Sequence, residues 1–215
     1  MLLGLGLCSQ YRFNNLTLLT PLLIPMNLGL FGGSFDPIHL GHMLVAQAAR
    51  EELGLDRLFF IPAAQSPFKP DAKPTAANER LRLLRLALAG QTDCEVDDQE
   101  VRRGGVSYTI DTVRDYFSRF SQGNLFYLVG GDNVAHLPKW RDADKLARLV
   151  EFVAIPRPGE VEAAFPAPFR GRTLKGFPLG VSSSQIRARV KAGLPVENLV
   201  PRAVAEAIRN NRLYL

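Results

Sequence analysis

Short apolar runs alternate with longer segments of helical apolar spacing from residue 28 onward. The apolar runs predict β-strands at Leu28–Phe31, Arg57–Pro62, Cys94–Val96, Asn124–Val129, Val150–Ile155 and near Thr173–Leu174. The helical spacing predicts α-helices at His39–Leu53, Thr75–Ala89, Thr109–Phe120, Asp142–Leu149, Ser183–Ala192 and Pro201–Arg209. This alternation is typical of an α/β domain, a doubly wound parallel sheet with helices on both faces, here followed by a small helical C-terminal section.

Several residues mark the ends of these elements. Gly54 and Gly90 follow two predicted helices, where glycine readily adopts the left-handed backbone that ends a helix. Thr75 is suited to cap the helix that follows it. We expect Arg102–Arg103 in a loop and the proline-rich Pro156–Phe169 as an irregular connection.

Residues 1–25 do not follow the alternation. Their only charged side chain is Arg12, which lies between two apolar patches. A secretory signal would carry positive charge before its apolar core and small residues at a cleavage site, and neither is present. Because Met26 directly precedes the first strand, we expect residues 1–25 to be an extension that is loose or not translated. Residues 26–215 then form the domain; a peripheral apolar anchor is the alternative for the extension.

The composition is that of a globular protein, with 215 residues of which 47% are hydrophobic. No stretch reaches the roughly 18 consecutive apolar residues that a membrane-spanning helix needs. Two cysteines, Cys8 and Cys94, are too few for a disulfide scaffold, so we expect a cytoplasmic protein without a membrane partner. The net charge of +5 fits a polyanionic ligand or an ordinary surface. The arginines are scattered along the chain, so no nucleic-acid partner is expected. A homo-oligomer remains possible.

A segment rich in glycine and histidine, GGSFDPIHLGH, follows the first strand at residues 32–42. It is neither a G-x-G-x-x-G nor a Walker A motif. We expect Gly32 and Gly33 to let a ligand approach the backbone without a Cβ in the way. The helix that opens near His39 presents free N–H groups and a positive dipole end, which favour an anion. The segment therefore predicts a phosphate-binding loop.

His39 and His42 are two of the three histidines in the chain. Three residues apart, they lie on one side of the helix, and we expect Gly41 to leave the surface between them bare for a base or a phosphate. A pair of core or capping histidines is one alternative. A metal pair is another, although zinc would need ligands beyond the nearby Asp36.

A second segment, VSSSQIR at residues 181–187, predicts another anion site. Ser182 and Gln185 have the spacing of a capping box, so a helix is expected to begin there with free N–H groups. Arg187 lies one turn further along and can offer a planar fork of donors to the same anion. An ordinary capped helix with a solvated arginine is the alternative.

These two segments resemble the signatures of the nucleotidylyltransferase superfamily. Residues 39–42 are similar to H-x-G-H, and residues 181–187 are similar to I-S-S-T-x-I-R with two conservative departures. The resemblance implies a Rossmann-like nucleotidylyltransferase fold and ATP as a substrate, and it makes His39, His42 and Arg187 the catalytic residues. It assigns ATP binding to Gly32, Gly33, Ser34, Phe35, Gly41, Asp132, Ser182, Ser183 and Ser184.

Three further segments resemble the bacterial nicotinate-nucleotide adenylyltransferases. Residues 107–112 match S-Y-T-x-D-T, and residues 130–140 are similar to G-x-D-x-x-x-x-L-x-x-W. Residues 67–69 are similar to the end of P-x-H-K, with Phe68 in place of the histidine, and Arg141 stands where an aromatic residue is common. The resemblance assigns the mononucleotide to Lys69, Tyr108, Thr109 and Trp140.

The resemblance implies adenylyl transfer from ATP to nicotinate mononucleotide, giving deamido-NAD and pyrophosphate in NAD biosynthesis. Trp140 suits a positively charged pyridinium ring, because indole is the best aromatic face for a cation; core packing is the alternative. Backbone amides near Thr109 would receive the ring carboxylate, and Asp132 suits ribose hydroxyls. Mg²⁺ is expected as a cofactor carried on the ATP phosphates, without protein ligands.

Two other functions are compatible with the signatures. A sibling adenylyltransferase that uses nicotinamide mononucleotide, phosphopantetheine or FMN shares both of them, but the segment at 107–112 and Trp140 argue against it. A non-catalytic nucleotide sensor would keep the phosphate cradle without turnover. The intact set of His39, His42 and Arg187 argues against that sensor.

Overall fold

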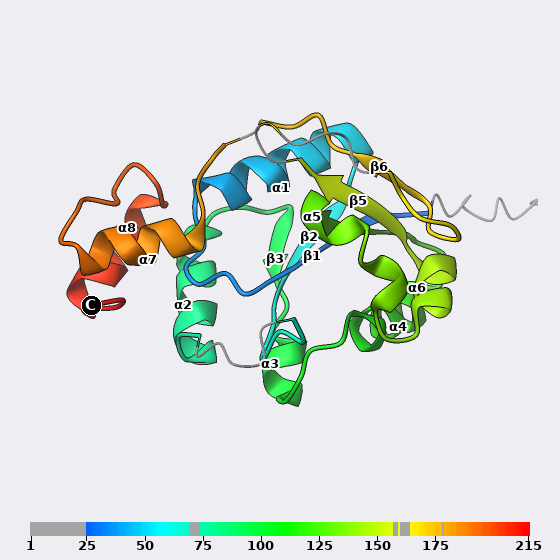
Figure 1. Ribbon diagram of the computed structural model, residues 1–215, viewed down its shortest axis with the longest axis horizontal. Coiled ribbons are helices and arrows are strands. Elements are labelled where there is room, and N and C mark those ends of the chain that lie inside the picture. Colours follow the sequence, from blue (N-terminus) through cyan, green and yellow to red (C-terminus); the bar gives the residue numbers. More distant parts are fainter. Residues whose placement is uncertain (1–24, 69–73, 157–158, 160–163, 178) are drawn as a thin grey trace, which may run out of the picture.

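The computed structural model describes residues 25–68, 74–156, 159, 164–177 and 179–215. Within these residues, six strands form a single sheet in the order β3-β2-β1-β4-β5-β6, and every neighbouring pair is parallel (Figure 1). The strands are β1 (Asn27–Gly33), β2 (Arg57–Pro62), β3 (Cys94–Val96), β4 (Asn124–Gly130), β5 (Glu151–Ile155) and β6 (Gly171–Thr173). The expected doubly wound parallel sheet is confirmed.

The chain moves outward from β1 to β3 and then returns to the other side of β1 for β4. In such sheets the crevice at the carboxyl ends of the two strands where the order reverses is the usual ligand site. Here that crevice lies after β1 and β4. The helices are α1 (Leu40–Leu53), α2 (Ala77–Ala87), α3 (Gln99–Arg103), α4 (Thr109–Arg119), α5 (Gly131–Val134), η1 (Leu137–Lys139), α6 (Ala143–Leu149), α7 (Ser183–Lys191) and α8 (Arg202–Asn210).

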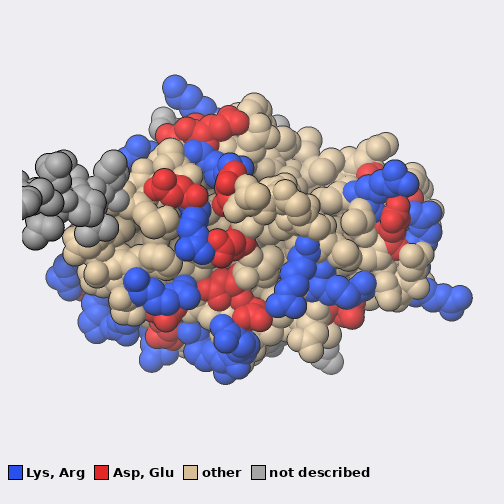
Figure 2. Space-filling view, turned by 180° about the vertical axis from the view of Figure 1, so that it is seen from behind, with Lys and Arg blue, Asp and Glu red and all other residues tan. Residues whose placement is uncertain are grey.

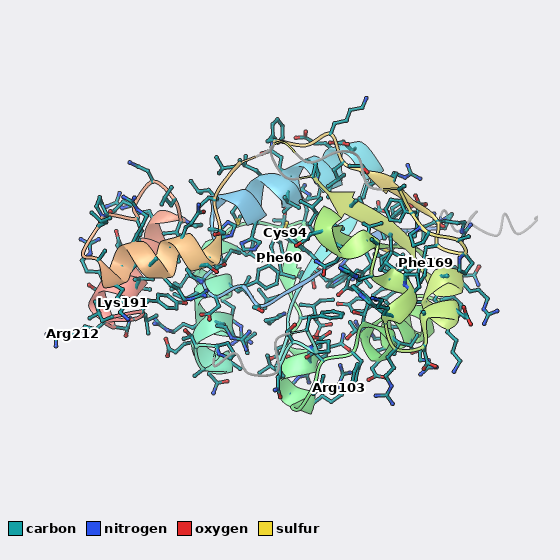
Figure 3. All side chains as sticks on the ribbon, viewed as in Figure 1. Phe60, Cys94, Arg103, Phe169, Lys191 and Arg212 are labelled. Carbon is teal, nitrogen blue, oxygen red and sulfur yellow. The ribbon has the colours of Figure 1, made fainter. Side chains whose placement is uncertain are left out.

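Each face of the sheet has its own core, because alternate residues of a strand point to opposite faces. Leu28 and Leu30 of β1 are buried with side chains of α4 and α6. Phe31 is buried on the other face with side chains of α1, α2, α7 and α8. Figure 3 shows two other members of this second core, Phe60 and Cys94, in the interior of the molecule.

All six predicted strands and all six predicted helices are present, and their ends shift by only a few residues. The C-terminal helices α7 and α8 lie together at one end of the molecule, with α8 beside α2 (Figure 1). The small helical C-terminal section is therefore confirmed. Three short helical elements, α3, α5 and η1, were not predicted, because segments of three to five residues are too short to show an apolar period.

Two local predictions are wrong. The N-cap of α2 is Ala76 rather than Thr75, whose backbone N–H instead donates to Asp36 Oδ2 at 3.1 Å. Arg102 and Arg103 form the last turn of α3 instead of a loop, where their charge complements the negative end of the helix dipole.

The surface carries charges of both signs. On the rear face, Lys and Arg side chains are interspersed with Asp and Glu (Figure 2). Among the described residues, no helix combines the length and apolarity that crossing a bilayer requires. The expected extension at residues 1–25 lies outside the described residues except for Pro25.

Candidate active site

A cavity of about 1000 Å³ opens at the carboxyl ends of β1, β4 and β5. Its volume is at the upper end of the range typical of small-molecule sites. It is lined by residues of the loop after β1, of the start of α1, of the end of β4 and of the segment before α7, together with Arg187 and Tyr214. The two motifs singled out in the sequence therefore meet at one cavity, at the point where the sheet reverses its order.

The two histidines stack on each other at the start of α1. His39 is the N-cap residue, and its ring centroid lies 3.7 Å from that of His42 with 27° between the planes. The backbone N–H of His39 donates to His42 Nδ1 at 3.2 Å. Because a neutral imidazole has one donor and one acceptor nitrogen, this bond leaves the His42 proton on Nε2.

Burial keeps both histidines uncharged at neutral pH. It lowers the pKa of His39 to about 4. Burial, with a smaller contribution from the neighbouring His39, lowers the pKa of His42 well below its ordinary value. The pair can therefore donate hydrogen bonds to an anion but does not bring positive charge to the ligand-free site.

The second motif is bonded directly to the first. Ser182 and Gln185 form the predicted capping box at the start of α7. The Ser183 hydroxyl donates to the Pro37 carbonyl at 2.8 Å, across 146 residues of sequence. Arg187 Nη1 donates to the Asp36 carbonyl at 2.7 Å, so both motifs are held in one rigid arrangement.

Arg187 is oriented from two sides. In addition to the bond to the Asp36 carbonyl, its Nη2 donates to Ser184 Oγ at 3.4 Å. Neither of these two partners is a carboxylate, so neither neutralises the positive charge that the guanidinium can offer to an anion in the cavity. Ser183 and Ser184 thus line the cavity while their hydroxyl groups serve the protein's own contacts.

Two buried charged residues support this site and were not predicted to belong to it. Asp36 is 6% exposed and accepts from the Thr75 backbone N–H. Arg80 is 1% exposed and donates to three backbone carbonyls, those of Thr75, Ser34 and Ala64. Burial lowers the pKa of this guanidinium and the charges of Asp36 and Tyr214 raise it, but an arginine stays charged at neutral pH. Arg80 therefore ties the loop after β1 to α2 as a buried cation.

The glycines of the first motif are closely packed against side chains of the protein itself. A Cβ at Gly32 would lie 2.2 Å from the Tyr127 hydroxyl oxygen. One at Gly33 would lie 3.0 Å from the Phe35 ring. At Gly41 it would lie 3.0 Å from both His39 Nδ1 and Val181 Cγ1, so this glycine allows the two motifs to approach each other.

The comparisons with known proteins agree with this geometry. The model of the cytidylyltransferase-like family matches residues 30–189. A protein of Opitutus terrae, named as a probable nicotinate-nucleotide adenylyltransferase, is 41% identical over 88% of this chain and 98% of its own length. One of Gemmatimonas aurantiaca with the same name is 42% identical over 88% of this chain and 92% of its own length.

The chain belongs to the nicotinate-nucleotide adenylyltransferase family. Among solved structures it is similar in fold to the nicotinic acid mononucleotide adenylyltransferase of Plasmodium falciparum complexed with NaAD. The TM-score is 0.73 at 17% identity, covering 88% of this chain and 97% of that one.

In this member of the nicotinate-nucleotide adenylyltransferase family, most predicted ATP-binding residues line the cavity. Besides the residues already placed, they include Ser34, Phe35, Gly41, Asp132 and Ser182. Gly32 and Gly33 lie just behind this lining, as the last two residues of β1. Asp132 is exposed in α5 and accepts from Asn133 Nδ2 at 3.0 Å.

Three of the residues predicted to bind the mononucleotide form a separate cluster, outside the lining of this cavity: Tyr108, Thr109 and Trp140. Thr109 Oγ1 donates to the Tyr127 hydroxyl at 3.4 Å, and the Tyr127 ring packs edge-on against Trp140. Trp140 also packs edge-on against Phe152, so it is partly a core residue, as the alternative held. The cluster contacts the middle of β4 through Tyr127.

Phe68 and Arg141, the two departures from the pattern of the nicotinate-nucleotide adenylyltransferases, lie at this cluster. Phe68, which is 54% exposed, packs against Trp140 with centroids 5.6 Å apart. The Arg141 guanidinium lies 4.6 Å from the centre of the Tyr108 ring, a cation–π contact. Lys69, the remaining residue assigned to the mononucleotide, lies outside the described residues.

Among the described residues, no group of three or more His, Cys, Asp or Glu side chains could hold a metal ion. Mg²⁺ prefers oxygen ligands and keeps several waters, so triphosphate oxygens can supply its coordination. The two histidines are stacked ring on ring, an arrangement that does not point two lone pairs at one ion.

Proposed function

We propose that this protein transfers the adenylyl group of ATP to nicotinate mononucleotide, giving deamido-NAD and pyrophosphate. One observation carries the proposal. Arg187 and Ser183 are bonded to the loop that leads into His39, over a cavity at the reversal point of the sheet. That arrangement gathers a cation, neutral donors and helix N-termini around one cavity.

The reaction needs alignment more than proton transfer. A phosphate oxygen of the mononucleotide attacks the α-phosphorus of ATP, the bond from that phosphorus to the bridging oxygen breaks, and pyrophosphate leaves. The attacking oxygen is already an anion, so no general base is required. Holding two reactants in line is worth about 7–11 kcal/mol, more than a general base typically supplies.

His42 and Arg187 have distinct parts in this proposal. The Nε2–H group of His42 is a neutral hydrogen-bond donor in the first turn of α1, and it is suited to the oxygen on which charge develops. Arg187 supplies full positive charge and two-pronged geometry for the leaving pyrophosphate. The stacked ring of His39 holds His42 in place and lines the same cavity.

We place the pyridinium ring of the mononucleotide at Trp140, beside the start of α4. Tyr108 is the N-cap residue of α4 and provides no side-chain cap, so the first amides of the helix are suited to the ring carboxylate. The Arg141 guanidinium, held over Tyr108, adds a positive charge at the same place. In the described residues Arg141 forms no ion pair, and the neighbouring Asp142 pairs with Arg114 and Lys145.

Mg²⁺ bound to the ATP phosphates would supply charge neutralisation during the transfer. The chain's own contribution is to hold the nucleotide and the acceptor at a fixed distance. We propose a cytoplasmic location, because two cysteines are too few for the disulfide scaffold of a secreted protein.

The test is an assay of purified protein with ATP and Mg²⁺, offered nicotinate mononucleotide and nicotinamide mononucleotide separately. Pyrophosphate release is measured together with the dinucleotide product. We expect turnover with the acid and much slower turnover with the amide. Faster turnover with the amide, phosphopantetheine or FMN would assign a sibling activity, and ATP binding without pyrophosphate release would indicate a nucleotide sensor.

A further inference from the structure

The end of the chain enters the cavity. After α8 ends at Asn210, the last residues turn back toward the loop after β1, with Arg212 at φ 49° and Tyr214 at φ 68°. L-residues adopt this left-handed backbone at a cost, so local contacts must hold the tail in place. Figure 3 shows Arg212 at the outer edge of the molecule, whereas the Tyr214 side chain lines the cavity.

Tyr214 is joined to the phosphate loop by a charged hydrogen bond. Its hydroxyl donates to Asp36 Oδ1 at 3.0 Å, and the backbone N–H of Thr75 donates to Oδ2 of the same carboxylate at 3.1 Å. Burial and the neighbouring Asp36 raise the pKa of Tyr214, so the hydroxyl is a protonated donor at neutral pH.

Asp36 connects this bond to the cation of the site. The side chain of Asp36 receives Tyr214, and its backbone carbonyl receives Arg187 Nη1. A buried carboxylate that loses a donor bears a large desolvation cost, and the backbone that carries it shifts to recover a partner. Such a shift would move the carbonyl that orients Arg187.

We propose that Tyr214 is a positioning residue of the ATP site, which holds Arg187 in its working orientation through Asp36. The inference rests on the proposed function for its kinetic readout. The C-terminal tail is then part of the active site instead of a mere end of the chain. The substrate contact stays with Arg187, and Tyr214 acts through it.

The structure offers a matched control. Tyr116 is also a buried tyrosine whose hydroxyl donates to a carboxylate, Asp97, at 2.6 Å. It lies in the core on the other face of the sheet and outside the lining of the cavity. Tyr214→Phe and Tyr116→Phe therefore remove the same chemical group from two environments that differ in their relation to Arg187.

We expect Tyr214→Phe to lower kcat/KM for ATP by about tenfold, the loss of one hydrogen bond to a charged group, and to leave KM for the mononucleotide unchanged. Tyr116→Phe should lower Tm but keep the full kcat/KM. Equal kinetic losses in the two variants, or none in either, would overturn the inference.

A double-mutant cycle tests the route through Arg187. On an Arg187→Lys background, Tyr214→Phe should cost less than about twofold, because interacting residues are not additive. Two full, additive losses would show that Tyr214 acts independently of Arg187. If the wild type releases no pyrophosphate, the proposed function fails, and the same cycle is then read from the dissociation constant of ATP measured by calorimetry.

Discussion

At the scale of single residues, the histidine pair is defined by where its protons lie. The bond from the His39 backbone to His42 Nδ1 fixes the donor on Nε2, and burial prevents a second proton. In the proposed mechanism the pair would donate directed hydrogen bonds without charge, and Arg187 would supply the positive charge.

This assignment predicts a graded response at position 42. His42→Ala should lower kcat by about 10²–10³-fold, as for other transition-state donors. His42→Gln carries its amide near the Nε2 position and should retain more turnover than His42→Asn, whose amide lies near the Nδ1 position. Pyrophosphate release measures all three variants, with Tm as the check on folding; Asn outperforming Gln would contradict the assigned tautomer.

Burial of His39 predicts a pH dependence of stability in the ligand-free protein. Its pKa is about 4 when folded and about 6.5 when unfolded, so the unfolded chain binds the proton first as pH falls. Above about pH 6.5 His39 is neutral in both states and does not affect the free energy of unfolding. As the pH falls from 6.5 toward 4, protonation of His39 in the unfolded chain alone lowers that free energy. Between pH 7 and pH 5 the free energy of unfolding should fall by about 1–2 kcal/mol on this account.

Urea unfolding at the two pH values measures this fall. His39→Gln, which cannot titrate, serves as the comparison and should show a smaller decrease. An equal decrease in the wild type and the variant would show that other groups are responsible.

Arg141 predicts a preference between the two mononucleotides. Arg141→Gln should reduce the ratio of kcat/KM for the acid to that for the amide by about two- to fivefold, the range expected of a solvent-exposed ion pair. Turnover of the amide should hardly change. Steady-state assays with both substrates measure the ratio; an unchanged ratio would leave recognition of the carboxylate to the backbone amides of α4.

At the scale of elements, close approach between α1 and the segment before α7 shapes the cavity. Gly41 permits this approach, since a Cβ would press on His39 and Val181 at 3.0 Å. Gly41→Ala should therefore weaken ATP binding by about tenfold, within the 1–3 kcal/mol typical of overpacking.

Gly123→Ala is the control for this substitution. Its Cβ would be crowded by the Met26 carbonyl oxygen at 3.2 Å, away from the cavity. We expect Gly123→Ala to lower Tm without weakening ATP binding, and calorimetry measures the ATP affinity of both variants. An unchanged affinity in Gly41→Ala would show that the spacing of the motifs tolerates adjustment.

The same scale shows what the sequence could and could not predict. Apolar periodicity predicted the strands and the long helices, because an element that is buried on one or two faces has apolar residues at regular intervals in the sequence. The five residues of α3 contain too few apolar positions for a period. The sequence predicted that the two motifs meet at one site. It did not predict the hydrogen bonds of Ser183 and Arg187 to backbone carbonyls, because every residue has a carbonyl and no residue type identifies the acceptor.

Long-range polar partners were the larger omission. In the sequence, Arg80 cannot be distinguished from the other arginines of its helix. Its role depends on the carbonyls of Ser34, Ala64 and Thr75, which only the fold brings around it. Tyr214 lies 178 residues from Asp36 along the chain. Such partnerships depend on the packing of distant elements, which local patterns do not encode.

At the scale of the whole molecule, the site joins the start of the domain to its end. Because ATP would contact both motifs, it should slow amide hydrogen exchange in residues 34–42 and in residues 182–187 together. Exchange in α3 should not change. Mass spectrometry of the exchanged protein with and without ATP measures this effect, and protection of the first segment alone would contradict a shared site.

Arg80 also influences how the cavity responds to its solvent. This cation lies behind the loop, shielded from water, and two of its carbonyl partners belong to residues that line the cavity. Mobile ions screen charges in solution over about 8 Å at physiological ionic strength, but they screen buried charges far less. The attraction between Arg80 and the neighbouring Asp36 is therefore fixed in the protein interior, where added salt weakens it little.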